Sequence, residues 1–189
     1  RRPGDHFILC PVCTAAAGRL PPSLYGMALI ETIRSAWGWC GVDPDEVIGE
    51  NDFGNLILKD SAGCYWRLCP EELSCELVAH DRKELDALSA DQEFLRDWHL
   101  SALRDEAFGR LGVLPEGRVY CLKIPGTLGD EYGGDNLATI ELDELIRASG
   151  HMALQIKDLP DGAQVRLQVT ECPLHPRPVG AARHRRTRV

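Results

Sequence analysis

The spacing of apolar side chains predicts one helix near the start of the chain and a run of short strands behind it. From Met27 onward, apolar residues recur at helical spacing: Leu29, Ile30, Ile33 and Trp37. Short extended segments follow, separated by turns rich in glycine, asparagine and aspartate, at 46–50, 55–59, 64–68 and 75–79. Short strands punctuated in this way are typical of an antiparallel meander.

The second half of the chain reads mainly as helix. Asp81 is a suitable N-cap, with Glu84 three residues later, and predicts a helix at 81–88. After an interruption at 89–91, a long helix is predicted to about residue 110, with an apolar stripe formed by Leu95, Trp98 and Ala102. A last helix is predicted from Glu141 to about residue 156.

Two further strands complete the expected fold. One is predicted at 119–122, and a second at 163–169, where apolar and polar residues alternate. Strands that come first, with helices inserted later, favour an α+β class. We therefore expect a largely antiparallel sheet, a meander, packed with three to four helices in a single domain. Trp66 should face inward on a central strand, and Trp37 should pack on the sheet.

The two ends of the chain lack this periodicity. Residues 1–26 are rich in arginine, proline, glycine and alanine, and residues 171–189 are rich in arginine, histidine and proline. We interpret 1–26 as an unpatterned extension, disordered or not native to the domain, and 171–189 as a disordered basic tail. The folded domain is expected to span 27–170.

The charge of the chain is uneven. The whole chain carries a net charge of −8, but residues 27–170 hold 13 basic and 27 acidic residues, a net charge of −14. Nucleic acids and anionic membranes need the opposite sign, so neither is an expected partner. An acidic domain steers toward basic proteins. The alternative is that the charge serves solubility alone.

The sequence also indicates the compartment. No apolar run approaches the roughly 20 residues that span a bilayer, and no signal peptide is visible, so we expect a cytoplasmic protein. The eight cysteines are scattered and read as reduced thiols. Three of them lie in strand patterns and are expected to act as small buried hydrophobes: Cys64, Cys75 and Cys121.

A glycine-rich loop at 125–136 is the first candidate site. Its spacing fits neither a dinucleotide fingerprint nor a P-loop, and its carboxylates would repel a phosphate. No basic residue lies near them in sequence after Lys123, so we expect them to bind a basic partner: Asp130, Glu131 and Asp135. Two alternatives stay open. The loop is a solvated connection, or it serves a small-ligand or enzymatic site.

The second candidate is a zinc site. Two pairs have the two-residue spacing of zinc ligands, Cys10 with Cys13 and Cys172 with His175. The pairs flank the core at opposite ends, so a site requires the termini to meet, and the alternative is coincidence. No nucleophile is seen beside a base, so we expect no catalytic residues and no cofactor.

Several separated stretches, in the same order, resemble one family of small bacterial domains. They include Trp37-Gly38-Trp39, Asn51-Asp52-Phe53-Gly54-Asn55, Tyr65-Trp66-Arg67-Leu68-Cys69-Pro70-Glu71, Tyr120-Cys121-Leu122-Lys123-Ile124-Pro125-Gly126 and Gln155-Ile156-Lys157-Asp158-Leu159-Pro160-Asp161-Gly162. The chain is similar, over about 27–170, to the C-terminal domain of type VI secretion immunity proteins that neutralise a DNase toxin.

This resemblance implies a function that the residues alone do not. It implies a non-enzymatic immunity protein whose partner is a basic protein toxin, a DNase effector. It carries no catalytic residues over to this chain. The acidity of 27–170 agrees with such a partner, because a nuclease presents a basic cleft to DNA.

Overall fold

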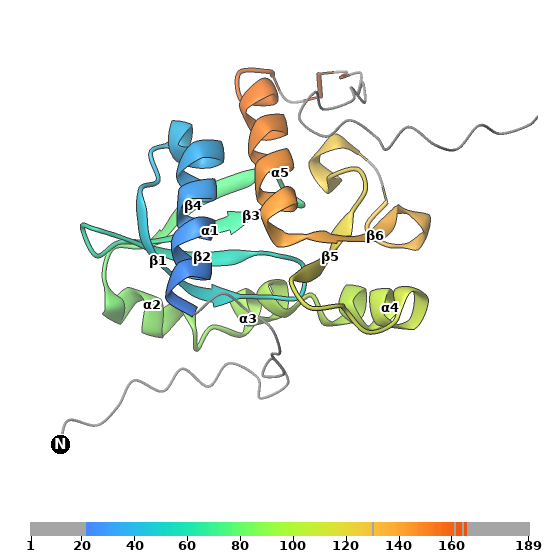
Figure 1. The fold of residues 1–189 in the computed structure, drawn as a ribbon, viewed down its shortest axis with the longest axis horizontal. Helices are drawn as coiled ribbons and strands as arrows, with labels where there is room; N and C mark the ends of the chain where they lie inside the picture. The colour runs from blue at the N-terminus through green and yellow to red at the C-terminus, as the bar shows by residue number, and fades with distance from the viewer. Residues whose placement is uncertain (1–21, 130, 161, 164, 166–189) are drawn as a thin grey trace, which may run out of the picture. The chain divides into compact units, whose positions relative to one another are not determined.

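The central sheet is a four-stranded antiparallel meander, seen in the computed structural model of the chain (Figure 1). Its strands are paired in chain order: β1 (Pro44–Glu50), β2 (Leu56–Asp60), β3 (Tyr65–Cys69) and β4 (Ser74–Ala79). The α+β class and the meander are thus confirmed. Strand β1 begins earlier than predicted, at Pro44, which suits a proline because β1 is an edge strand.

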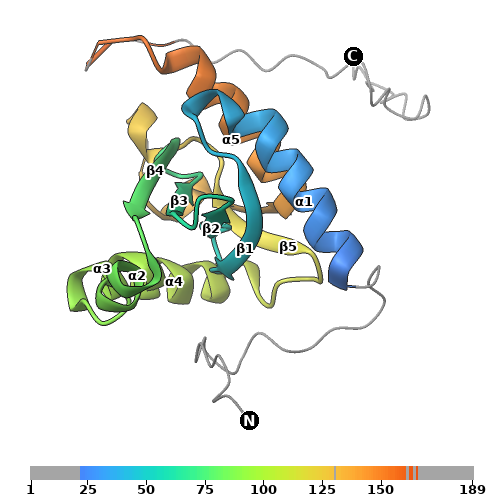
Figure 2. The ribbon, with the colours of Figure 1, turned by 90° about the vertical axis from the view of Figure 1, so that its left-hand side faces the viewer.

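Helices cover both faces of this sheet. On one face α1 (Pro22–Trp37) and α5 (Leu142–Ile156) run side by side, and on the other lie α2 (Arg82–Leu88) and α3 (Gln92–His99) (Figure 2). Strand β2 shows why both faces need cover. Leu56 and Leu58 are buried in the core under α1 and α5, whereas Ile57 is buried in the core with α2 and α3.

The contact between α1 and α5 is close. Trp37 is fully buried, and its indole N–H donates to the Ile146 carbonyl at 3.1 Å. Gly150 lies opposite, where a Cβ atom would stand 2.6 Å from the Ala36 carbonyl oxygen. The glycine in the middle of α5 therefore permits the approach of the two helices.

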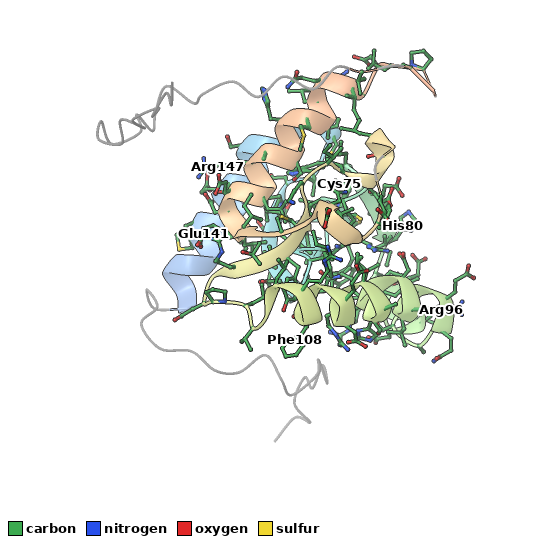
Figure 3. The ribbon with its side chains drawn as sticks, turned by 90° about the vertical axis from the view of Figure 1, so that its right-hand side faces the viewer. Cys75, His80, Arg96, Phe108, Glu141 and Arg147 are labelled. Atoms are coloured by element: carbon green, nitrogen blue, oxygen red, sulfur yellow. The ribbon has the colours of Figure 1, made fainter. Side chains whose placement is uncertain are left out.

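A polar cluster closes the outer edge of the same contact. Arg147 lies where α5 runs beside α1 (Figure 3), and it pairs with Asp143 one turn earlier at 2.8 Å. Its Nη2 also donates to the Thr32 hydroxyl at 3.1 Å, and that hydroxyl donates to Asp143. The cluster ties the two helices at their solvent-facing side.

The last two strands form a separate two-stranded sheet instead of joining the meander. Strands β5 (Arg118–Leu122) and β6 (Leu137–Glu141) are antiparallel, and α4 (Ser101–Leu111) packs on them through Ala107. The Tyr120 N–H donates to the Asp52 carbonyl at 2.8 Å, which joins β5 to the turn between β1 and β2.

The long helix predicted from residue 92 to residue 110 is two helices. Asp91 caps the first, α3, by accepting from the N–H groups of Glu93 and Phe94. Leu100 then adopts a left-handed conformation, φ 44°, which ends α3 before α4 begins. The break changes the buried face: Trp98 is buried as expected, but Ala102 is exposed, and Ala107 is the buried residue of α4.

The predicted N-cap of α2 is confirmed, whereas Trp66 is less buried than expected. The Asp81 side chain caps α2 by accepting from the Glu84 N–H, as predicted, although the Glu84 carboxylate accepts from the N–H of His80. Trp66 lies on the central strand β3, packs against the main core and donates to Asp60 at 2.9 Å, but it is only half-buried.

The boundaries of the folded part also differ from those expected. The structure describes residues 22–129, 131–160, 162, 163 and 165. Helix α1 begins at Pro22, five residues before the predicted start, so part of the extension assigned to 1–26 is helical. The described residues from 22 to 159 belong to one compact unit, and Pro160 belongs to a second. Residues 163 and 165 are not in a strand, and the remainder of the predicted strand at 163–169 lies outside the described residues.

Substituting Gly150 by alanine should destabilise the fold, although alanine is the better helix former. The new Cβ would meet backbone and ring atoms of α1, and overpacking of this kind costs about 1–3 kcal/mol. The matched control is Gly109→Ala in α4, where a Cβ has nothing within 4 Å. There the helix propensity of alanine should add about 0.5–1 kcal/mol. Urea unfolding measures the change in unfolding free energy of each variant relative to wild type. The same change in both variants would contradict the close packing at Gly150.

Candidate functional site

A pocket of about 290 Å³ opens beside strands β3 and β4. Helix α3 forms another part of its wall, and the loop between β5 and β6 contributes Tyr132. The side chains that matter for its chemistry are Arg67, Glu72, Glu76, Phe94, Asp97 and Tyr132. With Glu71, which also lines it, the pocket therefore joins one guanidinium, four carboxyl groups and two aromatic rings.

Arg67 is the cation of this pocket and is largely buried. Its Nη1 pairs with the Asp97 carboxylate, and its Nη2 donates to Asn55 Oδ1 at 3.1 Å. The guanidinium also lies over the rings of Phe94 and Trp98, with its carbon 5.7 and 6.0 Å from their centroids. Such cation–π contacts add to the ion pair and fix the orientation of the side chain. Within the described chain its Nε has no hydrogen-bond partner.

Asn55 and Glu71 form the floor of the site. Both are buried, and Asn55 Nδ2 donates to both carboxylate oxygens of Glu71, at 2.7 and 2.9 Å. Burial raises the pKa of Glu71, because removal from water disfavours the charged form more than these hydrogen bonds favour it. The Glu71 carbonyl accepts from the Gly126 N–H at 2.8 Å, which ties the glycine-rich loop to the pocket.

Two exposed carboxylates at the pocket have no direct ion-pair partner among the described residues. The side chains of Glu72 and Glu76 make no hydrogen bond or ion pair with any described residue. Partial burial raises the pKa of Glu72, and the charge of Asp97 raises it further. Glu76 lies opposite Arg67 in the β3–β4 ladder, but the guanidinium pairs with Asp97 instead. The mouth of the pocket is therefore acidic.

The glycine-rich loop has fixed contacts with the rest of the fold. A Cβ at Gly126 would overlap the Tyr132 ring, so only glycine leaves room for that ring. Asn136 accepts from the Ile124 N–H and donates to the carbonyls of Ile124 and Glu131, at 2.8–2.9 Å. Two short 3-10 turns, Gly126–Leu128 and Gly134–Asn136, add local order.

Of the loop carboxylates, Asp135 differs from its expected state. Asp135 is fully exposed, but it pairs at 2.5 Å with Arg110, which comes from α4. The Glu106 carboxylate of the same helix accepts from the Gly134 N–H at 2.9 Å. Glu131 is exposed and also has an interaction, and Asp130 lies outside the described residues. The expectation that these carboxylates are free of basic neighbours is wrong for Asp135, because sequence distance hid Arg110.

The structure does not test the predicted zinc site. Cys10, Cys13, Cys172 and His175 all lie outside the described residues. In the part of the chain that is described, no three histidine, cysteine, aspartate or glutamate side chains gather as a metal site would require. No helix among the described residues is long and apolar enough to cross a membrane.

The described cysteines are free thiols. Cys121 is buried, and burial raises its pKa to about 11. Cys64 and Cys75, the latter labelled in Figure 3, are half-buried and not fully buried as expected. Burial also raises the pKa of Cys69. The raised values keep Cys69 and Cys121 as protonated, unreactive thiols at neutral pH.

Sequence reasoning missed Glu72 because it lies in a segment interpreted only as a turn, and it missed Glu76 because that residue lies in a segment interpreted only as a strand, 75–79. A signal was present: three glutamates fall within residues 70–76, and no lysine or arginine separates Arg67 from Arg82. Their convergence with α3 and Tyr132 was not readable, because it depends on the tertiary arrangement.

The arrangement is suited to recognition of a charged surface. It offers buried, oriented groups beneath an acidic mouth with aromatic walls. Comparison with known families indicates which class of protein carries it. Residues 79–153 match the family of the T6SS immunity protein Tdi1, C-terminal.

For residues 79–153, the match confirms the resemblance to the C-terminal domain of type VI secretion immunity proteins. The matched residues extend from the end of β4 into α5 and include Phe94, Asp97, Leu100 and Tyr132 of the pocket. Arg67, Glu72 and Glu76 precede them. A search of curated proteins finds no match to the chain.

Replacing Glu71 by glutamine should change how stability depends on pH. A carboxyl group whose pKa is raised by folding binds its proton more tightly in the folded state, so its contribution to stability falls as pH rises from the unfolded value through the folded one. A glutamine side chain does not titrate. Relative to wild type, the Glu71→Gln variant should therefore gain stability as pH rises from about 4.5, by up to about 1.4 kcal/mol per pH unit within that window.

Urea unfolding at a series of pH values from 4 to 8 measures this difference. Comparison with wild type cancels the titration of other carboxylates. A difference in unfolding free energy that stays constant over the whole series would show that Glu71 does not titrate abnormally.

Proposed function

We propose that this chain is an immunity protein that binds a toxin of a type VI secretion system in the cytoplasm and blocks its activity without catalysis. The observation that carries the proposal is the match of residues 79–153 to the immunity family. The matched segment supplies α3 and the loop with Tyr132, two of the walls of the acidic pocket.

A nuclease is the toxin class that the charge favours. Residues 27–170 carry a net charge of −14, and the carboxylates at the exposed mouth of the pocket are part of that charge. The cleft of a nuclease is basic because it binds phosphates. An acidic protein that covers the cleft competes with DNA, and long-range attraction speeds the encounter.

The loop carboxylates remain part of the proposed interface. Tyr132 of this loop lines the pocket, which supports the proposal that the loop carboxylates contribute to the same interface: Asp130, Glu131 and Asp135. The ion pair of Asp135 with Arg110 does not prevent this, because an exposed pair contributes little and exchanges readily for a partner's charge.

Coproduction with the toxin encoded beside this gene tests the proposed function. Cells that express the toxin domain alone should stop growing, and coexpression of this chain should restore growth. Binding of the purified proteins should be salt-sensitive: the association rate constant should fall by about 10-fold or more between low salt and about 0.5 M salt, with little change in dissociation. Growth arrest that this chain does not relieve would contradict the immunity function.

Reversing the loop charges tests the loop separately. Replacing all three loop carboxylates by lysine, Asp130→Lys with Glu131→Lys and Asp135→Lys, should slow association with the same toxin domain by about 10-fold at low salt. The melting temperature should change little, because Asp135 is exposed and surface ion pairs contribute about 0–1 kcal/mol. Unchanged association kinetics at low salt would remove the loop from the interface without affecting the proposed function.

A further inference from the structure

The pocket holds more negative charge than its one cation offsets. Arg67 is already used by Asp97 and Asn55, and its guanidinium is stacked against the rings of α3. The exposed carboxylates of Glu72 and Glu76 line the same cavity, and neither makes a hydrogen bond or an ion pair with a described residue, although the charge of Arg67 acts on Glu72 from a distance. A carboxylate at a partly enclosed site forms a strong charge-assisted hydrogen bond with a cation that enters through the mouth of the pocket.

We propose that this pocket receives an arginine side chain of the partner protein, with its guanidinium bound by the carboxylates of Glu72 and Glu76. That the arginine belongs to a toxin rests on the proposed function. The inference adds the recognition element, a single buried basic anchor, to what the general acidity of the chain supports.

The shape and lining of the cavity favour arginine over other occupants. An acidic group would meet Glu72, Glu76 and Asp97, so it is repelled. A planar guanidinium can bind two carboxylates and lie flat on an aromatic ring at the same time, whereas an ammonium is a strongly hydrated point charge. Tyr132 offers such a ring at the wall, and it is partly exposed.

The residues that would contact this side chain are already fixed by contacts within the chain. Tyr132 fits against Gly126, whose N–H is bonded to the Glu71 carbonyl below. On the other side, Arg67 is held by Asp97 and Asn55. A site whose groups are already oriented loses little conformational freedom on binding, and arginine is common among the residues that dominate interfaces.

A small probe tests the pocket without any toxin. N-acetyl-L-argininamide carries the guanidinium and no negative charge, and N-acetyl-L-citrullinamide has nearly the same shape without the positive charge. In a titration of the full chain followed by backbone amide NMR, the arginine derivative should give saturable shifts centred on the pocket, around Glu72, Glu76 and Tyr132. The citrulline derivative should give none.

Matched double variants test the assigned carboxylates. Glu72→Gln with Glu76→Gln should remove the saturable shifts and weaken binding of the neighbouring toxin domain by about 10-fold or more. The control pair, Glu46→Gln with Glu144→Gln, removes the same charge from exposed carboxylates on β1 and α5 that do not line the pocket. The control should leave the shifts in place and weaken toxin binding by less than about 2-fold.

The outcomes separate this inference from the proposed function. Shifts that never saturate, or that persist in the pocket double variant, would overturn the arginine pocket. Equal loss of toxin binding in both double variants would also overturn it, because the surface would then act only through total charge. If both double variants still protect cells and still bind the toxin, the toxin binds elsewhere on the chain. That result overturns the arginine pocket as the toxin's binding site and leaves the immunity function standing. Saturable arginine binding without any protection of cells would overturn the immunity function alone.

Discussion

The hydrogen bonds between Asn55 and Glu71 are the constraint on which the site depends. A buried carboxylate is tolerated only when its oxygens are satisfied, and one amide group satisfies both. The same amide presents its oxygen to Arg67, and the backbone carbonyl of Glu71 holds the loop at Gly126. Removal of the asparagine would leave a buried acid and a buried guanidinium short of partners at once.

Much of the fold followed from local patterns, because each one concerns neighbours in sequence. The meander was recognisable from turns between short strands, and the start of α2 from Asp81. The break at Leu100 was not, because no glycine or proline marks it and periodicity continues through it. Likewise, the role of Gly150 could not be predicted from its neighbours in sequence, because it is a contact with α1, more than a hundred residues earlier.

The candidate site was less predictable than the fold for the same reason. The loop was singled out from the sequence as a candidate site, and its residue Tyr132 lines the pocket. Its carboxylates were judged by their neighbours in sequence, which hid the ion pair between Asp135 and Arg110. Conversely, Glu72 and Glu76 looked ordinary, since only the folded chain places them with Phe94 and Asp97 around one cavity.

Leu100, in its left-handed conformation, connects the two helices that hold two walls of the pocket. Helix α3 before it carries Phe94 and Asp97, and α4 after it carries Glu106 and Arg110, which hold the loop that bears Tyr132. Two walls of the cavity therefore meet at one joint, and Leu100 itself lines the cavity. Insertion of one residue there would turn α4 by about 100° about its axis and carry the loop's anchoring groups away with it. The length of the chain at this joint therefore sets how the two walls face each other across the cavity.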